Sequence, residues 1–416
     1  MRKTQPVKFI YSCIQCGWEP DSTTGVHYLC PTCSAENTRD KPPSGTLRVF
    51  YDYHSLRSRG ITLAGLRKNA FLDLLPLSDA EHLPPLRIGQ TPLYEYQPEE
   101  DLPVHLFLKD DSQNPTFSYK DRASAVVSAF AAEHGLEVIV TASTGNAGSS
   151  MAGICAAQRQ KAVVMVPETA PIAKISQVLM YGATLVPVKG TYDDAFELSL
   201  AATETFGWYN RNTGYNPLTI EGKKTAAFEL AYQMKHRSID RLFIPVGDGV
   251  IISGIYKGFE DLLKLGLLDE MPVLVAVQSE RSDNLVRNLE LPDFEAVRSA
   301  TLADSISVDV PRNFFMARHF IHQYHGEGIT VSDEEILEAS SRLSAHYGIF
   351  AEPAAACAFA GLLKYFRMGR LENSSNNVVM LTGSGLKDLK SIQQIIAAPE
   401  AINPDIGELK KKMETA

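Results

Sequence analysis

The feature that most constrains this chain is the alternation of short apolar runs with longer amphipathic segments between residues 104 and 381. Short apolar runs separated by helical patterns predict parallel strands that are covered by helices. We expect strands at Val104–Leu108, Val138–Val140, Ala162–Val166, Thr184–Val188, Leu242–Val246, Val273–Val277 and Val378–Leu381. We expect helices at Ala123–His134, Ala147–Gln158, Ile172–Tyr181 and Tyr192–Phe206. The sequence therefore predicts an α/β fold, in which ligands bind at the loops that follow the carboxyl ends of strands.

Size and charge narrow the class of protein. A chain of 416 residues is long enough for more than one domain. Its formal net charge of −9 argues against a nucleic-acid-binding role that depends on neutralising phosphates, although a local pocket for a small anion is compatible with it. No apolar run approaches the roughly 20 residues of a membrane-spanning helix, and Met1–Ile10 lacks the apolar core of a signal peptide. We therefore expect a cytoplasmic protein with no membrane or nucleic-acid partner.

Four cysteines lie in the first 33 residues as two C-x-x-C pairs. Cys13 and Cys16 form the first pair, and Cys30 and Cys33 form the second, at the spacing of a zinc ribbon in which four thiolates surround one ion. The rival interpretation is a redox C-x-x-C, but redox motifs seldom occur in pairs at this spacing. Because four cysteine ligands leave no open position for a substrate, we expect the zinc to be structural.

Four polar segments lie at the expected junctions between strands and helices. Residues 114–122 read NPTFSYKDR and contain Lys120, which taken alone is most simply a solvated lysine at the start of a helix. Residues 141–146 read TASTGN, and their hydroxyls, amide and free backbone N–H groups can bind a carboxylate. The simpler alternative for this second segment is that Thr144 or Asn146 only caps a helix.

The third and fourth segments follow predicted strands in the second half of the chain. Residues 247–254 read GDGVIISG, where closely spaced glycines and a helix N-terminus can accept a phosphate. This segment is neither a P-loop nor a complete G-x-G-x-x-G fingerprint. Residues 381–388 read LTGSGLKD and follow the last predicted strand.

These four segments, in this order, resemble those of the fold-type II pyridoxal-phosphate enzymes, and most closely those of the threonine synthases. Residues 115–122 are similar to that family's PTGSFKDR, and residues 382–388 to its TGHGLKD. The resemblance covers nearly the whole chain, including the N-terminal zinc ribbon. It implies an α/β fold like that of the β subunit of tryptophan synthase, with two open twisted sheets, flanking helices, a small N-terminal zinc ribbon and a homodimeric assembly.

The resemblance also assigns roles, with pyridoxal 5′-phosphate and structural Zn²⁺ as cofactors. Lys120 is expected to carry pyridoxal 5′-phosphate as a Schiff base and to move protons at the substrate's α and β carbons. Asn146 is expected to hydrogen-bond the cofactor's phenolic oxygen and Thr382 to meet its pyridine nitrogen, while Glu352 matches a Glu-Pro turn near the ring and could equally be structural. The substrate carboxylate is expected at Ser143, Thr144, Gly145 and Asn146. The cofactor phosphate is expected at the backbone N–H groups of Gly247, Asp248, Gly249, Val250 and Ile251.

Two positions depart from the family's pattern for binding a substrate phosphate. Ala147 stands where the family has a threonine, and Thr219 stands where it has an arginine within NPxR(I/L)EGQKT. The loss of a bidentate guanidinium is not conservative for phosphate binding. Lys223, Arg211 or Lys174 could supply the missing charge.

The resemblance implies a lyase that acts on carbon–oxygen bonds and converts O-phosphohomoserine and water to threonine and phosphate. The two departures leave open a β-replacement enzyme similar to cysteate synthase that uses O-phosphoserine. They also leave open an ammonia-lyase acting on threonine, serine or a diamino acid. A zinc-ribbon binding module fused to an inactive α/β domain is a further alternative, which the intact lysine, asparagine and threonine oppose.

We expect four divisions of the chain. Residues 1–45 form the zinc ribbon and end in a linker at Pro42–Gly45. Residues 46–122 form an irregular lead-in and the first part of a large cofactor domain, and residues 123–236 form a small substrate-binding domain. Residues 237–416 complete the large domain, with a solvated tail over the last dozen residues.

Overall fold

The computed structural model describes residues 8–21, 25–235, 237–393, 396 and 398–414. The strands are β1 (Phe9–Cys13), β2 (Leu47–Tyr51), β3 (Leu93–Tyr96), β4 (His105–Asp110), β5 (Val138–Ala142), β6 (Lys161–Pro167), β7 (Thr184–Val188), β8 (Tyr209–Asn210), β9 (Arg241–Pro245), β10 (Val273–Ser279), β11 (Glu327–Val331) and β12 (Asn376–Leu381). The helices are α1 (Tyr53–Ser58), α2 (Leu63–Lys68), α3 (Lys120–Glu133), α4 (Asn146–Gln158), α5 (Ile172–Met180), α6 (Tyr192–Phe206), α7 (Leu218–Lys223), α8 (Thr225–Gln233), α9 (Val250–Leu265), α10 (Phe314–Gln323), α11 (Asp333–Tyr347), α12 (Pro353–Arg367), α13 (Leu389–Ile392) and α14 (Ile406–Glu414). Short 3₁₀ helices are η1 (Leu72–Leu74), η2 (Ala80–His82), η3 (Asp111–Gln113), η4 (Asp304–Ile306) and η5 (Gly385–Lys387).

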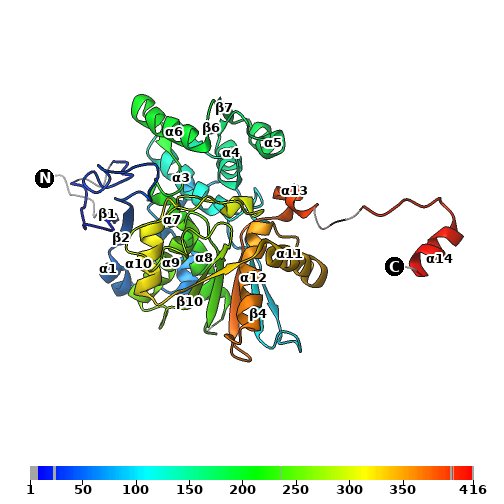
Figure 1. Ribbon diagram of the computed structural model, residues 1–416. Coiled ribbons are helices and arrows are strands. Elements are labelled where there is room, and N and C mark those ends of the chain that lie inside the picture. Colours follow the sequence, from blue (N-terminus) through cyan, green and yellow to red (C-terminus); the bar gives the residue numbers. More distant parts are fainter. Residues whose placement is uncertain (1–7, 22–24, 236, 394–395, 397, 415–416) are drawn as a thin grey trace.

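Two open sheets form the body of the protein (Figure 1). The larger sheet has the strand order β11-β10-β9-β12-β4-β3 and is parallel except for the antiparallel edge pair β3–β4. The smaller sheet has the order β7-β6-β5-β8 and is wholly parallel. Helices α4, α5 and α6 surround the smaller sheet, while α12 packs on β9, β10, β11 and β12 of the larger one. The predicted fold class of two sheets with flanking helices is therefore confirmed.

All seven predicted strands are present, with ends that shift by at most two residues. Strands β3 and β11 escaped prediction, and each lies at an edge of the larger sheet. Edge strands are only half covered, so they lack the continuous apolar run that marks a buried parallel strand. β3 is accordingly buried at none of its four positions. The antiparallel pair β1–β2 and the two-residue strand β8 were also not predicted.

Two predicted boundaries were wrong. Helix α3 begins at Lys120 rather than at Ala123, so the lysine lies in the first turn of the helix. The expected linker Pro42–Gly45 is part of the ribbon, because the Cys30 amide donates to the Gly45 carbonyl at 2.7 Å and the chain then continues into β2. Gly45 has φ +83°, and a Cβ there would lie 3.0 Å from the Cys30 carbonyl oxygen, so the tight approach requires glycine.

The ribbon and the strand β2 that follows it pack on both sheet layers. Tyr51 Oη donates to Glu221 Oε2 at 2.6 Å on α7, and Arg48 pairs with Glu260 on α9 at 2.5 Å. On the other side, the Asn210 amide of β8 donates to Tyr28 Oη at 2.8 Å. At the opposite end of the chain, α14 buries none of its residues and lies away from the body in Figure 1. Among the described residues no helix has the length and apolar character needed to cross a bilayer.

Candidate active site

The predicted site residues meet at one cavity of about 580 Å³ between the two sheets. Four of the surrounding segments follow the carboxyl ends of β4, β5, β9 and β12, where an open α/β sheet binds ligands. The predicted residues that border the cavity are Lys120, Ser143, Thr144, Gly145, Asn146, Gly247, Asp248, Gly249, Val250, Ile251 and Thr382. A larger cavity of about 890 Å³ lies elsewhere, beside Glu95 and Arg237, and touches none of them. We therefore take the smaller cavity as the candidate active site.

Lys120 is positioned by pairing between its own loop and the loop that follows β12. The Tyr119 amide donates to the Thr382 carbonyl at 2.9 Å, and the Ser384 amide donates to the Phe117 carbonyl at 3.1 Å. Phe117 has φ +66°, a left-handed conformation that costs of order 1 kcal/mol or more in a non-glycine residue. This strained turn places Lys120 beside Thr382 at the floor of the cavity.

The two residues after Lys120 have structural roles that sequence reasoning missed. Asp121 accepts hydrogen bonds from the Thr116 amide at 2.7 Å and from Thr116 Oγ1 at 2.5 Å, which closes the loop before α3. Arg122 is buried and binds Asp111 at 2.6 Å and Glu229 at 2.7 Å. The signal was present in the Lys-Asp-Arg run, but the partner carboxylates lie far away in the sequence. Asp121 and Arg122 therefore bind groups inside the protein, whereas Lys120 borders the cavity.

Asn146 is tied to Glu352 across the cavity. Its Nδ2 lies 3.1 and 3.0 Å from the two carboxylate oxygens of Glu352, and Ser305 Oγ donates to Glu352 at 3.3 Å. Burial raises the pKa of Glu352, against the opposing effects of Asn146 and Lys120. Burial likewise lowers the pKa of Lys120, with Glu352 opposing the shift. Burial therefore favours the uncharged form of both groups, and an uncharged lysine amine is nucleophilic.

The loop Ser143–Asn146 presents a helix N-terminus to the cavity. Gly145 is the N-cap of α4 and makes no side-chain cap hydrogen bond, so the alternative that Thr144 or Asn146 simply caps the helix is wrong. Ser143 Oγ accepts from the Gly145 amide at 3.2 Å and holds the loop in shape. The first N–H groups of a helix lack intrahelical partners, so this loop can accept an anionic group such as a carboxylate.

A second uncapped helix N-terminus faces the cavity at α9. Gly249 is its N-cap with φ +82° and no side-chain cap. A Cβ on Gly247 would lie 3.0 Å from Ile306 Cα, so the loop has no room for a side chain on that side. Asp248 Oδ1 accepts from the Arg312 amide at 3.1 Å and anchors the loop. A glycine cradle at the start of a long helix fits a phosphate, and together with the nearby lysine amine it fits pyridoxal phosphate.

The three candidates that could replace the family's arginine at position 219 differ in their position relative to the cavity. Lys223 borders the cavity and is fully buried. Arg211 is also buried, but it stands behind Thr213, to whose hydroxyl it donates at 2.8 Å. Lys174 pairs with Asp304 at 2.7 Å. Thr219 turns its hydroxyl to the Asn216 carbonyl at 2.8 Å, whereas Ala147 borders the cavity.

Residues from α6 and from the segment before α10 also border the cavity, and no motif indicated them. Tyr192, Asp193, Ser305 and Arg312 are among them. Arg312 pairs with Asp193 at 2.5 Å and so joins the layer of the smaller sheet to the segment that leads into α10. These residues lie in irregular chain or on a helix of ordinary amphipathic pattern, so the sequence carried no local signal for them.

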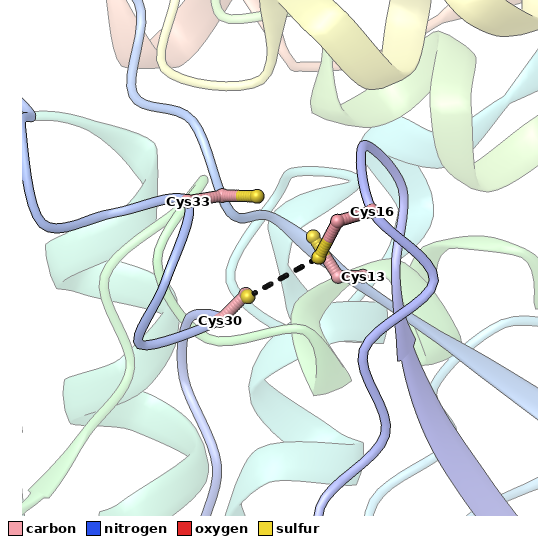
Figure 2. A group of neighbouring side chains, drawn as sticks. All are labelled: Cys13, Cys16, Cys30 and Cys33. Carbon is pink, nitrogen blue, oxygen red and sulfur yellow. Dashed lines mark hydrogen bonds between the residues drawn. The ribbon is translucent and has the colours of Figure 1, made fainter.

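Outside the cavity, the four cysteines of the two knuckles converge as predicted (Figure 2). The Sγ atoms of Cys13, Cys16, Cys30 and Cys33 all lie within 4.8 Å of one another, and Cys16 and Cys30 are 3.7 Å apart. Tetrahedral ligands about 2.3 Å from a zinc ion are roughly 3.8 Å apart, so the cluster fits this metal. All four are free thiols rather than disulfides.

Comparisons with known proteins agree with this geometry. Residues 85–383 match the family described as pyridoxal-phosphate dependent enzymes. The chain is 33% identical over 410 residues to a threonine synthase of Methanocaldococcus jannaschii, and the aligned region covers 96% of this chain and 98% of that protein. It is 34% identical to a threonine synthase of Bacillus sp., covering 83% of this chain and 97% of that one.

Solved structures share the fold. A threonine deaminase isoform of Solanum lycopersicum has a TM-score of 0.63 at 20% identity and covers 95% of this chain and 99% of its own. A maize serine racemase has a TM-score of 0.62 at 20% identity and covers 79% and 92%. At such identities the likeness shows the fold alone. The family match and the two curated relatives carry the assignment: the chain belongs to the pyridoxal-phosphate dependent enzymes and, within them, to the threonine synthase family.

Proposed function

We propose that this protein is a threonine synthase that converts O-phosphohomoserine and water to threonine and phosphate. One observation carries the proposal: the amine of Lys120 and two uncapped helix N-termini border the same cavity. One N-terminus suits a carboxylate and the other a phosphate. The names of the relatives support the choice of reaction, because both are threonine synthases.

The proposed assignments follow the geometry of the cavity. Lys120 would hold pyridoxal 5′-phosphate covalently, Asn146 would hydrogen-bond its phenolic oxygen, and Thr382 would meet its pyridine nitrogen. The backbone at Gly247–Ile251 would bind the cofactor phosphate. Ser143–Asn146 would bind the substrate carboxylate, so the two anionic ends of the bound molecules would be fixed by two helices. Such fixing lets one bond at the α carbon align for reaction.

Lys120 would also move protons during the reaction. When bound, pyridoxal phosphate supplies an electron sink for the negative charge that develops at the substrate's α carbon. Burial lowers the pKa of Lys120, so its amine can take a proton from the α carbon and return protons at neighbouring carbons. A threonine hydroxyl at the ring nitrogen cannot hold a full pyridinium charge as a carboxylate can, which favours elimination and replacement chemistry. The ion pair between Arg312 and Asp193 lies at the cavity, where it would limit the entry of water.

The remaining proposals concern the whole molecule. We propose that Cys13, Cys16, Cys30 and Cys33 bind one structural Zn²⁺. We propose a cytoplasmic homodimer whose partner in catalysis is a phosphorylated amino acid. We propose that residues 46–122 and 237–416 form the large domain and residues 123–236 the small one. The position of strands β5–β8 in a sheet of their own supports the small domain.

The test is a substrate screen of the purified protein with pyridoxal phosphate. We expect equal molar amounts of threonine and phosphate from O-phosphohomoserine. O-phosphoserine with a nucleophile, and threonine or serine alone, test the β-replacement and ammonia-lyase alternatives, which the residues Ala147 and Thr219 leave open. If the protein binds the cofactor but leaves O-phosphohomoserine unchanged, the proposed reaction is wrong. Borohydride should fix the cofactor to wild-type protein and not to the Lys120→Ala variant; a fixed adduct in the variant would show that another lysine holds it.

A further inference from the structure

Two buried lysines at the end of α7 have opposite surroundings. Lys224 binds Asp261 at 2.8 Å and also Glu221, so its charge is balanced by two carboxylates. Lys223 is equally buried, yet its Nζ has no hydrogen-bond partner within the described residues. A buried ammonium without a partner is costly, and native proteins keep such groups only where something else compensates them. Lys223 therefore needs an explanation that Lys224 does not.

The backbone around Lys223 is held in place from three sides. Tyr119 Oη donates to the Lys223 carbonyl at 2.6 Å, which ties it to the loop that carries Lys120. A Cβ on Gly222 would lie 2.1 Å from the Arg122 carbonyl oxygen, so α7 packs directly on α3. A Cβ on Gly254 would lie 2.7 Å from the Cβ of Lys223, so α9 packs equally closely. The backbone of Lys223 is therefore held in one position, and the residue borders the cavity.

A second unsatisfied cation stands behind it. Arg211 is buried, and its Nη2 also lacks a hydrogen-bond partner in the part of the chain that the structure describes. Its other nitrogens donate to the hydroxyls of Thr213 at 2.8 Å and Ser124 at 3.3 Å, not to carboxylates. Asp248 is the acidic group whose charge acts on Lys223, but its Oδ1 already accepts the Arg312 amide. Within the described residues, neither Lys223 nor Arg211 donates a hydrogen bond to a carboxylate.

We propose that Lys223 binds the phosphate group of the substrate, with Arg211 adding positive field from behind. The inference rests on the proposed function for the identity of the phosphate's carrier. The cofactor phosphate already has a place at the uncapped start of α9, and the carboxylate has one at the start of α4. The unsatisfied cation on α7 is left for a third anion. Lys223 follows Thr219 by four residues, one helical turn, so the two residues lie on the same face of α7, and Lys223 itself borders the cavity.

Proton uptake should accompany this binding. Burial, followed by the charges of Lys120 and Arg211, lowers the pKa of Lys223 well below its usual range, with Asp248 opposing. This shift disfavours the ammonium form of Lys223 in the anion-free site. A bound dianion favours the ammonium form and raises its pKa, so binding takes up a proton and weakens as the pH rises.

Calorimetric titration of the holoenzyme with inorganic phosphate tests the inference. Because the cofactor occupies its own phosphate site, added phosphate can bind only at the start of α4 or at the third site, and the Lys223 variants separate these two. At pH 8, where phosphate is already a dianion, two buffers of different ionisation enthalpy give the number of protons taken up. The variants are Lys223→Met, which keeps the size without charge, and Lys223→Arg, which keeps the charge. Lys161→Met removes a surface charge far from the cavity and is the matched control.

We expect Lys223→Met to weaken phosphate binding by tenfold or more, the loss of about one charge-assisted hydrogen bond, and to abolish proton uptake. Lys223→Arg should stay within a few fold of wild type, and Lys161→Met should not change. The inference is overturned if wild type binds no phosphate, if Lys223→Met binds it as wild type does, or if proton uptake survives the substitution. It is also overturned if Lys223→Met loses bound cofactor on dialysis while phosphate binding persists, since Lys223 would then serve the cofactor. Failure of wild type to make threonine would contradict the proposed function and leave these titrations unaffected.

Discussion

The buried cluster around Arg122 should control the stability of the larger domain. Arg122 binds Asp111 and Glu229 at 2.6 and 2.7 Å, and Lys109 adds a contact to Glu229 at 2.7 Å. Substitution of Arg122 by Met leaves two carboxylates buried with only part of their compensation. Removing one partner of a buried ion pair costs about 3–5 kcal/mol.

The pKa of Glu229 gives a second measure of the same contact. Burial alone would raise this pKa, but Arg122 and Lys109 hold it at about 2, against an ordinary value of 4.5. At about 1.36 kcal/mol per pKa unit, this corresponds to roughly 3 kcal/mol, of which Lys109 supplies part. We therefore expect Arg122→Met to lower the free energy of unfolding by about 3 kcal/mol at pH 7.

Urea unfolding followed by circular dichroism measures this loss, and its pH dependence identifies the cause. A carboxyl whose pKa is depressed by folding stabilises the protein above its unfolded pKa, and this contribution is lost as the pH falls towards 2. The difference between wild type and variant should therefore shrink by about 1 kcal/mol between pH 7 and pH 3.5. Arg237→Met is the matched control, because Arg237 binds Glu95 at 2.6 and 2.8 Å on the surface, where such pairs contribute about 1 kcal/mol or less. A loss below about 1 kcal/mol in Arg122→Met, or an equal loss in the control, would refute the reasoning.

Three further predictions concern other parts of the molecule. Metal analysis of the purified protein should find one zinc ion per chain. Cys16→Ser should lose the zinc and unfold at a lower temperature in thermal scans, whereas Cys155→Ala should keep it. Equal zinc content in the two variants would contradict the four-cysteine site. In the apoprotein, burial of the Glu352 carboxyl raises its pKa on folding, so Glu352 makes the free energy of unfolding fall as the pH rises above about 4.5. Urea titrations at several pH values should show that Glu352→Gln removes this part of the pH dependence. An unchanged pH dependence in the variant would show that folding does not raise the pKa of Glu352. Asp193→Asn should break the ion pair with Arg312 and raise KM for the amino-acid substrate about two- to fivefold, with little change in kcat. Asp194→Asn, at the adjacent position, should leave KM unchanged. Equal KM values in the two variants would exclude a role for the Asp193–Arg312 pair in substrate retention.

The covered strands in the interior of the fold were predictable from sequence, whereas of the edge strands only β7 was predicted. Strands such as β9 and β12 are covered on both faces, so their apolar runs are continuous and their ends were predicted to within two residues. β3 and β11 are half-covered edge strands, and the ribbon's β1–β2 pair depends on contacts between residues 9–13 and 47–51. Local pattern carries little information about such pairings, because they are decided by segments that are distant in sequence.

The candidate site divides in the same way. Residues within short motifs, such as Lys120 and Asn146, could be placed at the cavity because each motif lies at a strand end. The side-chain contacts could not be predicted: Glu352, expected only as part of a Glu-Pro turn near the ring, contacts Asn146 across 206 positions, and Glu229 contacts Arg122 across 107. Lys223 was one of three candidate cations, and only its burial, its cavity contact and its missing partner set it apart. The sequence shows which residues are charged, but only the fold shows whether a charged group has a hydrogen-bond or ion-pair partner.

The position of the ribbon would connect the proposed zinc ion to the cavity. Tyr51 on β2 donates to Glu221, which lies on α7 two residues before Lys223. Glu221 also binds Lys224, whose second partner Asp261 accepts a hydrogen bond from Tyr53 at 2.6 Å. The face of α7 opposite the cavity is therefore held by the chain that follows the cysteine knuckles. Loss of zinc would release β1 and β2, and with them the contact that fixes the turn of α7 carrying Lys223. The proposed structural zinc would in this way affect the proposed phosphate binding inside the cavity, although none of the four cysteines borders the cavity.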